Sequence, residues 1–175
     1  LLGTTFARDR LRELIFSVNT DWNDSTGRNF LSTRVTQDLG TALGGLPANE
    51  PLSSRQAGGG FQKWNVTAAR VHRLDDQLFA VFQGQHQFAF APLPTAEQYS
   101  LTGPATVRGY RQAGFLGDGG YNIGAEFRYS PILDDLDALQ LAVFIDHGNA
   151  YLKRSSPGEL NNVSATGAGF GIRFR

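Results

Sequence analysis

Side chains that could do catalytic or metal chemistry are few in this chain and are not grouped. The three histidines stand far apart, without the spacing of metal ligands: His72, His86 and His147. Two acidic pairs lie in turn-like segments, where carboxylates cap turns or remain solvated: Asp75-Asp76 and Asp134-Asp135. No Gly-x-Ser-x-Gly nucleophile elbow and no phosphate-binding loop occurs. We therefore expect neither an enzyme nor a metal or cofactor site.

One charged tetrapeptide, Val107-Arg108-Gly109-Tyr110, differs from an ordinary solvated loop. The glycine lets the backbone turn and approach other chain closely, while branched Val107 and bulky Tyr110 flank the arginine. Downstream, Gly117-Asp118-Gly119-Gly120 is a turn signal that opens directly into an alternating strand. These residues predict a structured loop whose arginine has a specific role and is not simply solvated. The alternative is a long hairpin loop with one exposed arginine.

Composition narrows the class of protein. The 175 residues fit one domain, and 16 basic residues balance 16 acidic ones, so nothing favours a nucleic-acid partner. Cysteine is absent, which excludes a disulfide framework. The longest apolar run, Leu141 to Ile145, is far shorter than the ~18 residues of a membrane helix. The chain does not begin with Met and shows no signal peptide, so we expect a fragment or a processed piece.

Apolar and polar residues alternate with a period of two along most of the chain, which predicts antiparallel strands. Eight strands are expected: Leu1–Arg8, Arg12–Thr20, Asn29–Leu39, Phe61–Arg73, Leu78–Phe90, Tyr121–Tyr129, Leu139–Asp146 and Ser164–Phe174. Short connections (21–27, 74–76, 131–138) alternate with long ones (40–60, 91–120, 148–162). This asymmetry is typical of transmembrane β-barrels, with short periplasmic turns and long external loops.

The charged side chains agree with a barrel. They fall on the polar faces of the predicted strands: Arg34, Asp38, Glu126, Arg128 and Asp146. In a water-filled lumen such groups are solvated, whereas a basic group on the lipid face at mid-depth costs about 2–4 kcal/mol. The fold class expected is therefore an all-β, antiparallel transmembrane barrel.

The segment LPTAEQYSLTGPATVRGY (Leu93 to Tyr110) resembles the lead-in to the lumen loop of two-partner secretion transporters, which activate and export haemolysins and adhesins. Further matching segments follow in order: 117–119 with Glu126, 144–148 and 167–173. Upstream, residues 60–63 and 70–74 also match, so the likeness covers almost the whole chain. One departure is Thr102, where the family usually has a second glycine.

The resemblance implies a bacterial outer-membrane pore that secretes an unfolded, haemolysin- or adhesin-like partner without a nucleotide or cofactor. The family barrel has sixteen strands, and this chain (residues 1–175) resembles strands seven to fourteen, with residues 91–120 as the lumen loop. The periplasmic domains and the last two strands would then lie elsewhere. Open sheet edges need another polypeptide, although eight strands can also close a small barrel.

Strand parity and the resemblance together predict one site. Arg108 is expected to reach the lumen and pair with Asp146, with Glu126 as a second acceptor, because both carboxylates lie on polar faces of strands after the loop. Val107, Gly109 and Tyr110 complete the loop motif.

Two other functions remain open on the sequence. One is a barrel-assembly insertase of the same superfamily, which shares the loop. The other is a soluble ligand-binding barrel or sandwich, because soluble antiparallel sheets also alternate apolar and polar residues.

Overall fold

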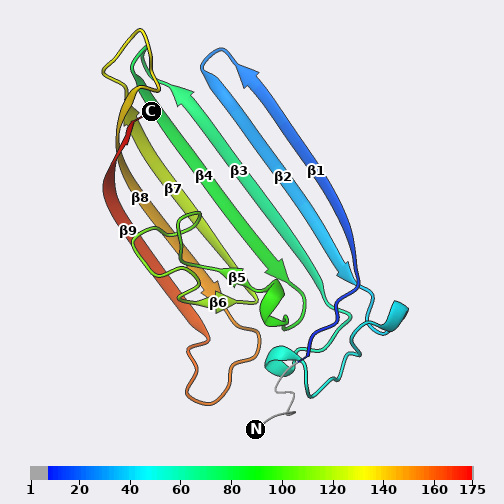
Figure 1. Ribbon diagram of the computed structural model, residues 1–175. Coiled ribbons are helices and arrows are strands. Elements are labelled where there is room, and N and C mark those ends of the chain that lie inside the picture. The colour runs from blue at the N-terminus through cyan, green and yellow to red at the C-terminus, as the bar shows by residue number, and fades with distance from the viewer. Residues whose placement is uncertain (1–7, 175) are drawn as a thin grey trace.

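Seven long strands form one antiparallel sheet in the computed structural model, which describes residues 8–174. They are β1 (Glu13–Asp24), β2 (Gly27–Asp38), β3 (Gln62–Arg73), β4 (Leu78–Ala89), β7 (Gly119–Tyr129), β8 (Leu139–Tyr151) and β9 (Asn162–Phe174). Each strand pairs with the next of these in chain order, as a meander. Within the described residues β1 and β9 do not pair with each other, so these strands alone form an open, curved sheet (Figure 1).

Seven of the eight predicted strands are present, with different ends. The first, Leu1–Arg8, falls outside the described residues apart from Arg8, which lies in no strand. The expected turn 21–27 shrinks to Ser25 and Thr26, because β1 and β2 stay paired to their tips. The expected loop 148–162 shrinks to 152–161. Its polar ends are strand residues, held by Asn149, whose Nδ2 donates to Asn162 Oδ1 and Ser164 Oγ.

The connections alternate between opposite ends of the sheet. The short turns, residues 25–26, 74–77 and 130–138, gather at one end, and the connections 39–61, 90–118 and 152–161 lie at the other; two of these are long, and 152–161 is only slightly longer than 130–138 (Figure 1). The long connections carry three short 3-10 turns: η1 (Ala42–Gly44), η2 (Ser54–Gln56) and η3 (Thr95–Glu97). No helix in residues 8–174 has the length and apolar character needed to span a bilayer.

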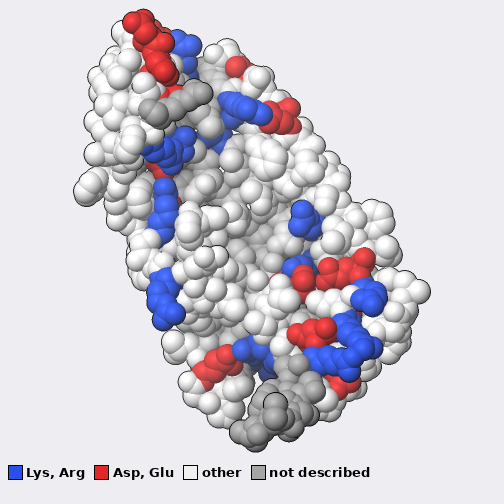
Figure 2. Space-filling view, viewed as in Figure 1, with Lys and Arg blue, Asp and Glu red and all other residues white. Residues whose placement is uncertain are grey.

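The two faces of the sheet differ in chemistry because side chains alternate along each strand. On the outward face, large apolar side chains are exposed, including Phe16 at 71%, Phe170 at 81% and Phe174 at 84%. Buried polar residues such as Asn122, Glu126 and Asp146 lie on the other face. Figure 2 shows the face on which the loop lies, where charged side chains occur along the hollow and at both ends. A soluble protein seldom exposes so large an apolar surface.

Candidate functional site

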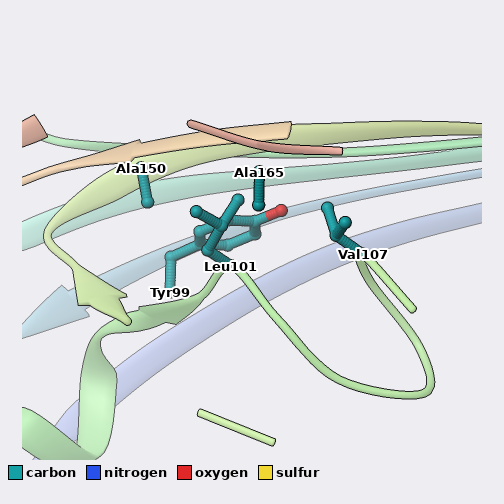
Figure 3. Close-up of a cluster of buried hydrophobic side chains, with 5 residues drawn as sticks. All are labelled: Tyr99, Leu101, Val107, Ala150 and Ala165. Atoms are coloured by element: carbon teal, nitrogen blue, oxygen red, sulfur yellow. The ribbon is translucent and has the colours of Figure 1, made fainter. Parts of the chain in front are cut away.

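The connection between β4 and β7 folds back over the concave face instead of extending away from it. It contains a two-residue hairpin, β5 (Tyr99–Ser100) with β6 (Leu116–Gly117), and crosses in front of β7 to β9 in Figure 1. Tyr99, Leu101 and Val107 project from it onto Ala150 and Ala165 of β8 and β9 (Figure 3). This buried apolar cluster holds the loop against the sheet. The predicted range 91–120 overlaps β7 by two residues, because β7 begins at Gly119.

The buried carboxylate of Asp118 ties the root of the loop together. Its Oδ1 accepts from the backbone N–H of Leu93 at 2.8 Å and from Gln98 Nε2 at 3.3 Å, and its Oδ2 accepts from the N–H of Lys153 at 2.7 Å. Entry to the loop, exit from it and the loop after β8 therefore meet at one side chain. From the sequence, Asp118 is expected in a turn and in a segment that matches the family, but not as a buried acceptor.

Arg108 lies at the far reach of the loop and binds two carboxylates. Its Nε and Nη2 donate to Asp146 Oδ2 at 2.7 Å and Oδ1 at 2.9 Å, a two-bond fork. Its Nη1 donates to Glu126 Oε2, and its backbone N–H reaches Asp146 Oδ2 at 3.2 Å. The guanidinium also lies over the Phe144 ring, 3.6 Å from the centroid, as in a cation–π contact.

The charges around Arg108 form a network. Glu126 also accepts from Arg128 Nε at 2.6 Å and lies 3.3 Å from Arg173 Nη2, so three arginines surround two carboxylates. Asp146 is fully buried and Glu126 is 5% exposed. The hydrogen bond that Arg108 donates to Asp146 raises the pKa of the Arg108 guanidinium above its ordinary value. The cost of removing these charged groups from water offsets much of the attraction between them, so we expect the network to hold Arg108 in position more than to add stability.

Glycines let the loop come this close. Gly109 has φ +93°, in the left-handed region that favours glycine, where the chain turns after Arg108. At Gly167 on β9 a β-carbon would overlap the Arg108 carbonyl oxygen. The Tyr110 hydroxyl donates to the carbonyl of Thr166 at 2.8 Å. The glycine-rich run of β9 is therefore the surface on which the loop tip lies.

The structure brings Arg108, Glu126 and Asp146 together, with Val107 buried in the apolar cluster and Tyr110 half exposed at the tip. It also adds residues that the sequence analysis did not assign to the site: Phe144, Asp118, Arg128, Arg173 and Thr102. Thr102, at the departure from the family pattern, braces the loop, since its hydroxyl donates to the Arg111 carbonyl at 2.9 Å and accepts from the Gly114 N–H at 3.0 Å. Among residues 8–174 no three His, Cys, Asp or Glu side chains group as metal ligands would.

Comparisons with known proteins agree with this architecture. The family model described as haemolysin secretion/activation protein ShlB/FhaC/HecB matches residues 3–174. Among solved structures, CdiB from Escherichia coli is similar with a TM-score of 0.76 at 18% identity. The match covers 97% of this chain and 31% of that chain, so this chain spans about a third of that protein's length. No curated protein sequence matches significantly.

Proposed function

The chain belongs to the haemolysin secretion/activation family of two-partner secretion transporters, and on that premise we propose that it forms part of an outer-membrane pore for protein export. The proposed cargo is an unfolded, haemolysin- or adhesin-like partner. The family is one of transporters and not of enzymes. It favours export over barrel insertion, the alternative that shares the loop motif.

The two faces support a membrane pore. Alternation places apolar side chains outward, as a lipid-facing band requires, and polar ones on the concave face, as a water-filled lumen requires. We orient the sheet in the membrane so that the short turns face the periplasm and the long connections face the exterior, as in other outer-membrane barrels. The unpaired edges of β1 and β9 would be completed by further strands, because open edges are not stable in lipid.

A single observation carries the proposal: Arg108 is held inside the concave face by Asp146 and Glu126. A loop lying in a pore must keep one position while cargo passes beside it. The planar guanidinium grips a carboxylate with two bonds, a geometry that lysine cannot reproduce. The proposed role of the contact is to set where the loop lies in the pore.

We therefore expect Arg108→Ala or Asp146→Ala to reduce secretion at least tenfold while the barrel still assembles. Arg108→Lys should restore only part of the activity, because it keeps the charge but loses the fork. The matched control is Arg111→Ala, a loop arginine that is exposed and makes no side-chain hydrogen bond within the described residues. The readout is partner protein in the medium, normalised to folded transporter in the outer membrane. Wild-type export by Arg108→Ala would refute the proposal.

A further inference from the structure

The outward face of the seven strands carries almost no charge. Residues that share this face by the pairing register include Leu14, Leu31, Ala68, Phe82, Ile123, Ile145 and Ala168. Following the register through every described strand, only two Asp, Glu, Lys or Arg residues fall on this face, Asp24 and Arg70, beside the three histidines His72, His86 and His147. Asp24 is the last residue of β1, and Arg70 lies three residues before the end of β3. Both stand near the short-turn end.

These two residues bind one another within a set of polar neighbours. Arg70 Nη1 donates to Asp24 Oδ2 and to Asn29 Oδ1, each at 2.6 Å. Arg70 Nη2 donates to Thr26 Oγ1 at 2.8 Å and lies 3.0 Å from His72 Nδ1. Within the described residues its Nε has no acceptor. The two charged side chains remain 31% and 40% exposed, so the pair is hydrogen-bonded to its neighbours and still partly open to the surroundings.

An apolar hollow of about 300 Å³ lies next to this pair, on the side toward the middle of the strands. Its floor is formed by two small residues that face each other across the β3–β4 ladder, Ala68 and Gly84. Its walls are larger apolar side chains, among them Trp22, Leu31 and Phe82. The Arg70–Asp24 ion pair thus lies beside this apolar hollow, called the furrow below, on the same outward surface.

We propose that this is a binding site for a zwitterionic phospholipid of the phosphoethanolamine class in the periplasmic leaflet. The inference rests on the proposed function for the placement of this face in a membrane. Arg70 would donate to the phosphate and Asp24 would accept from the ammonium group, while an acyl chain fills the furrow. Trp22 stands beside the pair, as indole rings do at a membrane interface.

The chemistry sets a selectivity. Because the charges of Arg70 and Asp24 cancel, an excess negative charge on phosphoglycerol lipids gains nothing at the pair. A choline headgroup has no N–H to donate to Asp24. Because only the phosphoethanolamine lipid brings an N–H-bearing cation to Asp24, it should be preferred over either by roughly tenfold.

The first test uses wild-type transporter isolated intact from outer membranes. It is placed in detergent with equal amounts of phosphatidylethanolamine, phosphatidylglycerol and phosphatidylcholine of the same acyl chains. Native mass spectrometry should show retention of one phosphatidylethanolamine in preference to the others. Equal retention of the three lipids would overturn the proposal, as would retention of none or of a bound protein in place of lipid.

Variants then locate the site. Arg70→Gln and Asp24→Asn should each reduce retention roughly tenfold. Gly84→Val should also reduce it by filling the furrow; a β-carbon there meets nothing nearer than 3.7 Å, so the strand can accept it. The matched control is Arg28→Gln, which breaks the Arg28–Asp21 ion pair on the concave face of β1 and β2. An equal loss in Arg28→Gln, or no loss in the other three, contradicts the proposal.

The failure of this inference can be separated from failure of the proposed function. If the pore function fails, the isolated protein does not export its partner, whatever lipid it retains. If only the lipid site fails, export-competent transporter inserts in the outer membrane and shows no preference for the phosphoethanolamine headgroup. Folding of each variant is checked by its heat-dependent shift on a denaturing gel, and the wild-type competition needs no variant.

Discussion

Asp118 is a buried carboxylate that holds three separate segments at the root of the loop. Two of its three donors are backbone N–H groups, from Leu93 and Lys153. The bond from the Leu93 N–H is buried, so removing its acceptor leaves a buried donor unpaired at a cost of about 1–3 kcal/mol, whereas the partly buried N–H of Lys153 loses less. Asp118 therefore positions the root of the loop, as Arg108 positions its tip.

Asp118→Ala should release the loop root without unfolding the sheet. We expect faster hydrogen exchange in residues 93–117 and reduced secretion, with strands β3 and β8 still protected. Asp118→Asn, which keeps one acceptor oxygen, should fall between Ala and wild type. The control is Asp134→Ala in an exposed short-turn segment, which should behave as wild type. Unchanged exchange across residues 93–117 in Asp118→Ala would contradict the assigned role.

At the scale of residues, the sequence predicted the arginine and its acceptors but not their neighbours. Strand parity was enough to place Glu126 and Asp146 on the concave face, and the resemblance supplied their partner. Phe144 lies on the same concave face, but in the sequence it looks like any apolar packing residue. Its contact with Arg108 could not be predicted, because it depends on how far the loop reaches along the concave face. The part played by these residues in secretion stays a prediction.

At the scale of elements, β9 is the strand on which the loop tip rests. Gly167, Gly169 and Gly171 share its concave face, yet they differ in their surroundings. A β-carbon at Gly167 would overlap the Arg108 carbonyl oxygen, whereas one at Gly171 would meet nothing within 4 Å. The same substitution at the two positions therefore separates loop docking from strand propensity.

Gly167→Val should push the loop away and impair secretion to a degree similar to Arg108→Ala. Gly171→Val, on the same face of the same strand, should secrete normally, since valine suits a strand and meets open space there. Both are measured by secretion and by heat-modifiability of the barrel. Equal behaviour of the two variants would show that the loop does not rest on β9 in the membrane.

The alternation of apolar and polar residues predicted correctly which face of the sheet each side chain occupies, but it misplaced the ends of the strands. Seven strands were located because a period of two persists over many residues. The ends were misplaced because Asn149 and Asn162 resemble loop residues, although they pair across β8 and β9 through side-chain hydrogen bonds. Nothing in local polarity distinguishes an asparagine that caps a loop from one that extends a ladder.

At the scale of the molecule, the long loops close over one end of the sheet. Arg55 donates from both Nη atoms to Glu159, at 2.7 and 3.1 Å, joining the loop after β2 to the loop after β8. The Arg55 Nη2 and Arg154 side chains reach backbone carbonyls of the opposite loop at 3.0 and 3.1 Å. In the proposed orientation this latch covers the external mouth of the pore.

The latch should open in acid. The hydrogen bond from Arg55, helped by the N–H of Ser156, lowers the pKa of Glu159 from 4.5 to about 2. A carboxylate with a depressed pKa contributes its full stabilisation above its ordinary pKa, and the contribution disappears as the pH falls through about 2. The loops should therefore loosen progressively between pH 4.5 and 2.

A spin label at Leu160, an exposed residue beside Glu159, measures this loosening. Its mobility should rise as the pH falls, and Glu159→Gln should be mobile already at neutral pH. A label at Val143 on β8 is the control for loss of the fold and should not change over the same range. A rigid Leu160 label in Glu159→Gln at neutral pH would contradict the latch.

The size of the complete pore is the feature that this sequence predicted least. Local periodicity counts strands within the chain, but barrel closure depends on what pairs with the edges of β1 and β9. The described strands leave both edges open, so the small closed barrel that eight strands could form is not built by residues 8–174. The sixteen strands implied by resemblance remain a proposal.

Export by purified transporter in liposomes tests the central claim most directly. The intact transporter is reconstituted, its unfolded partner is added outside in buffer without nucleotide, and protease-protected partner is measured after digestion. We predict that protected partner accumulates with wild type and with Arg111→Ala and falls at least tenfold with Arg108→Ala. No protected partner with wild type, or equal amounts with Arg108→Ala, would contradict a pore whose loop is positioned by Arg108.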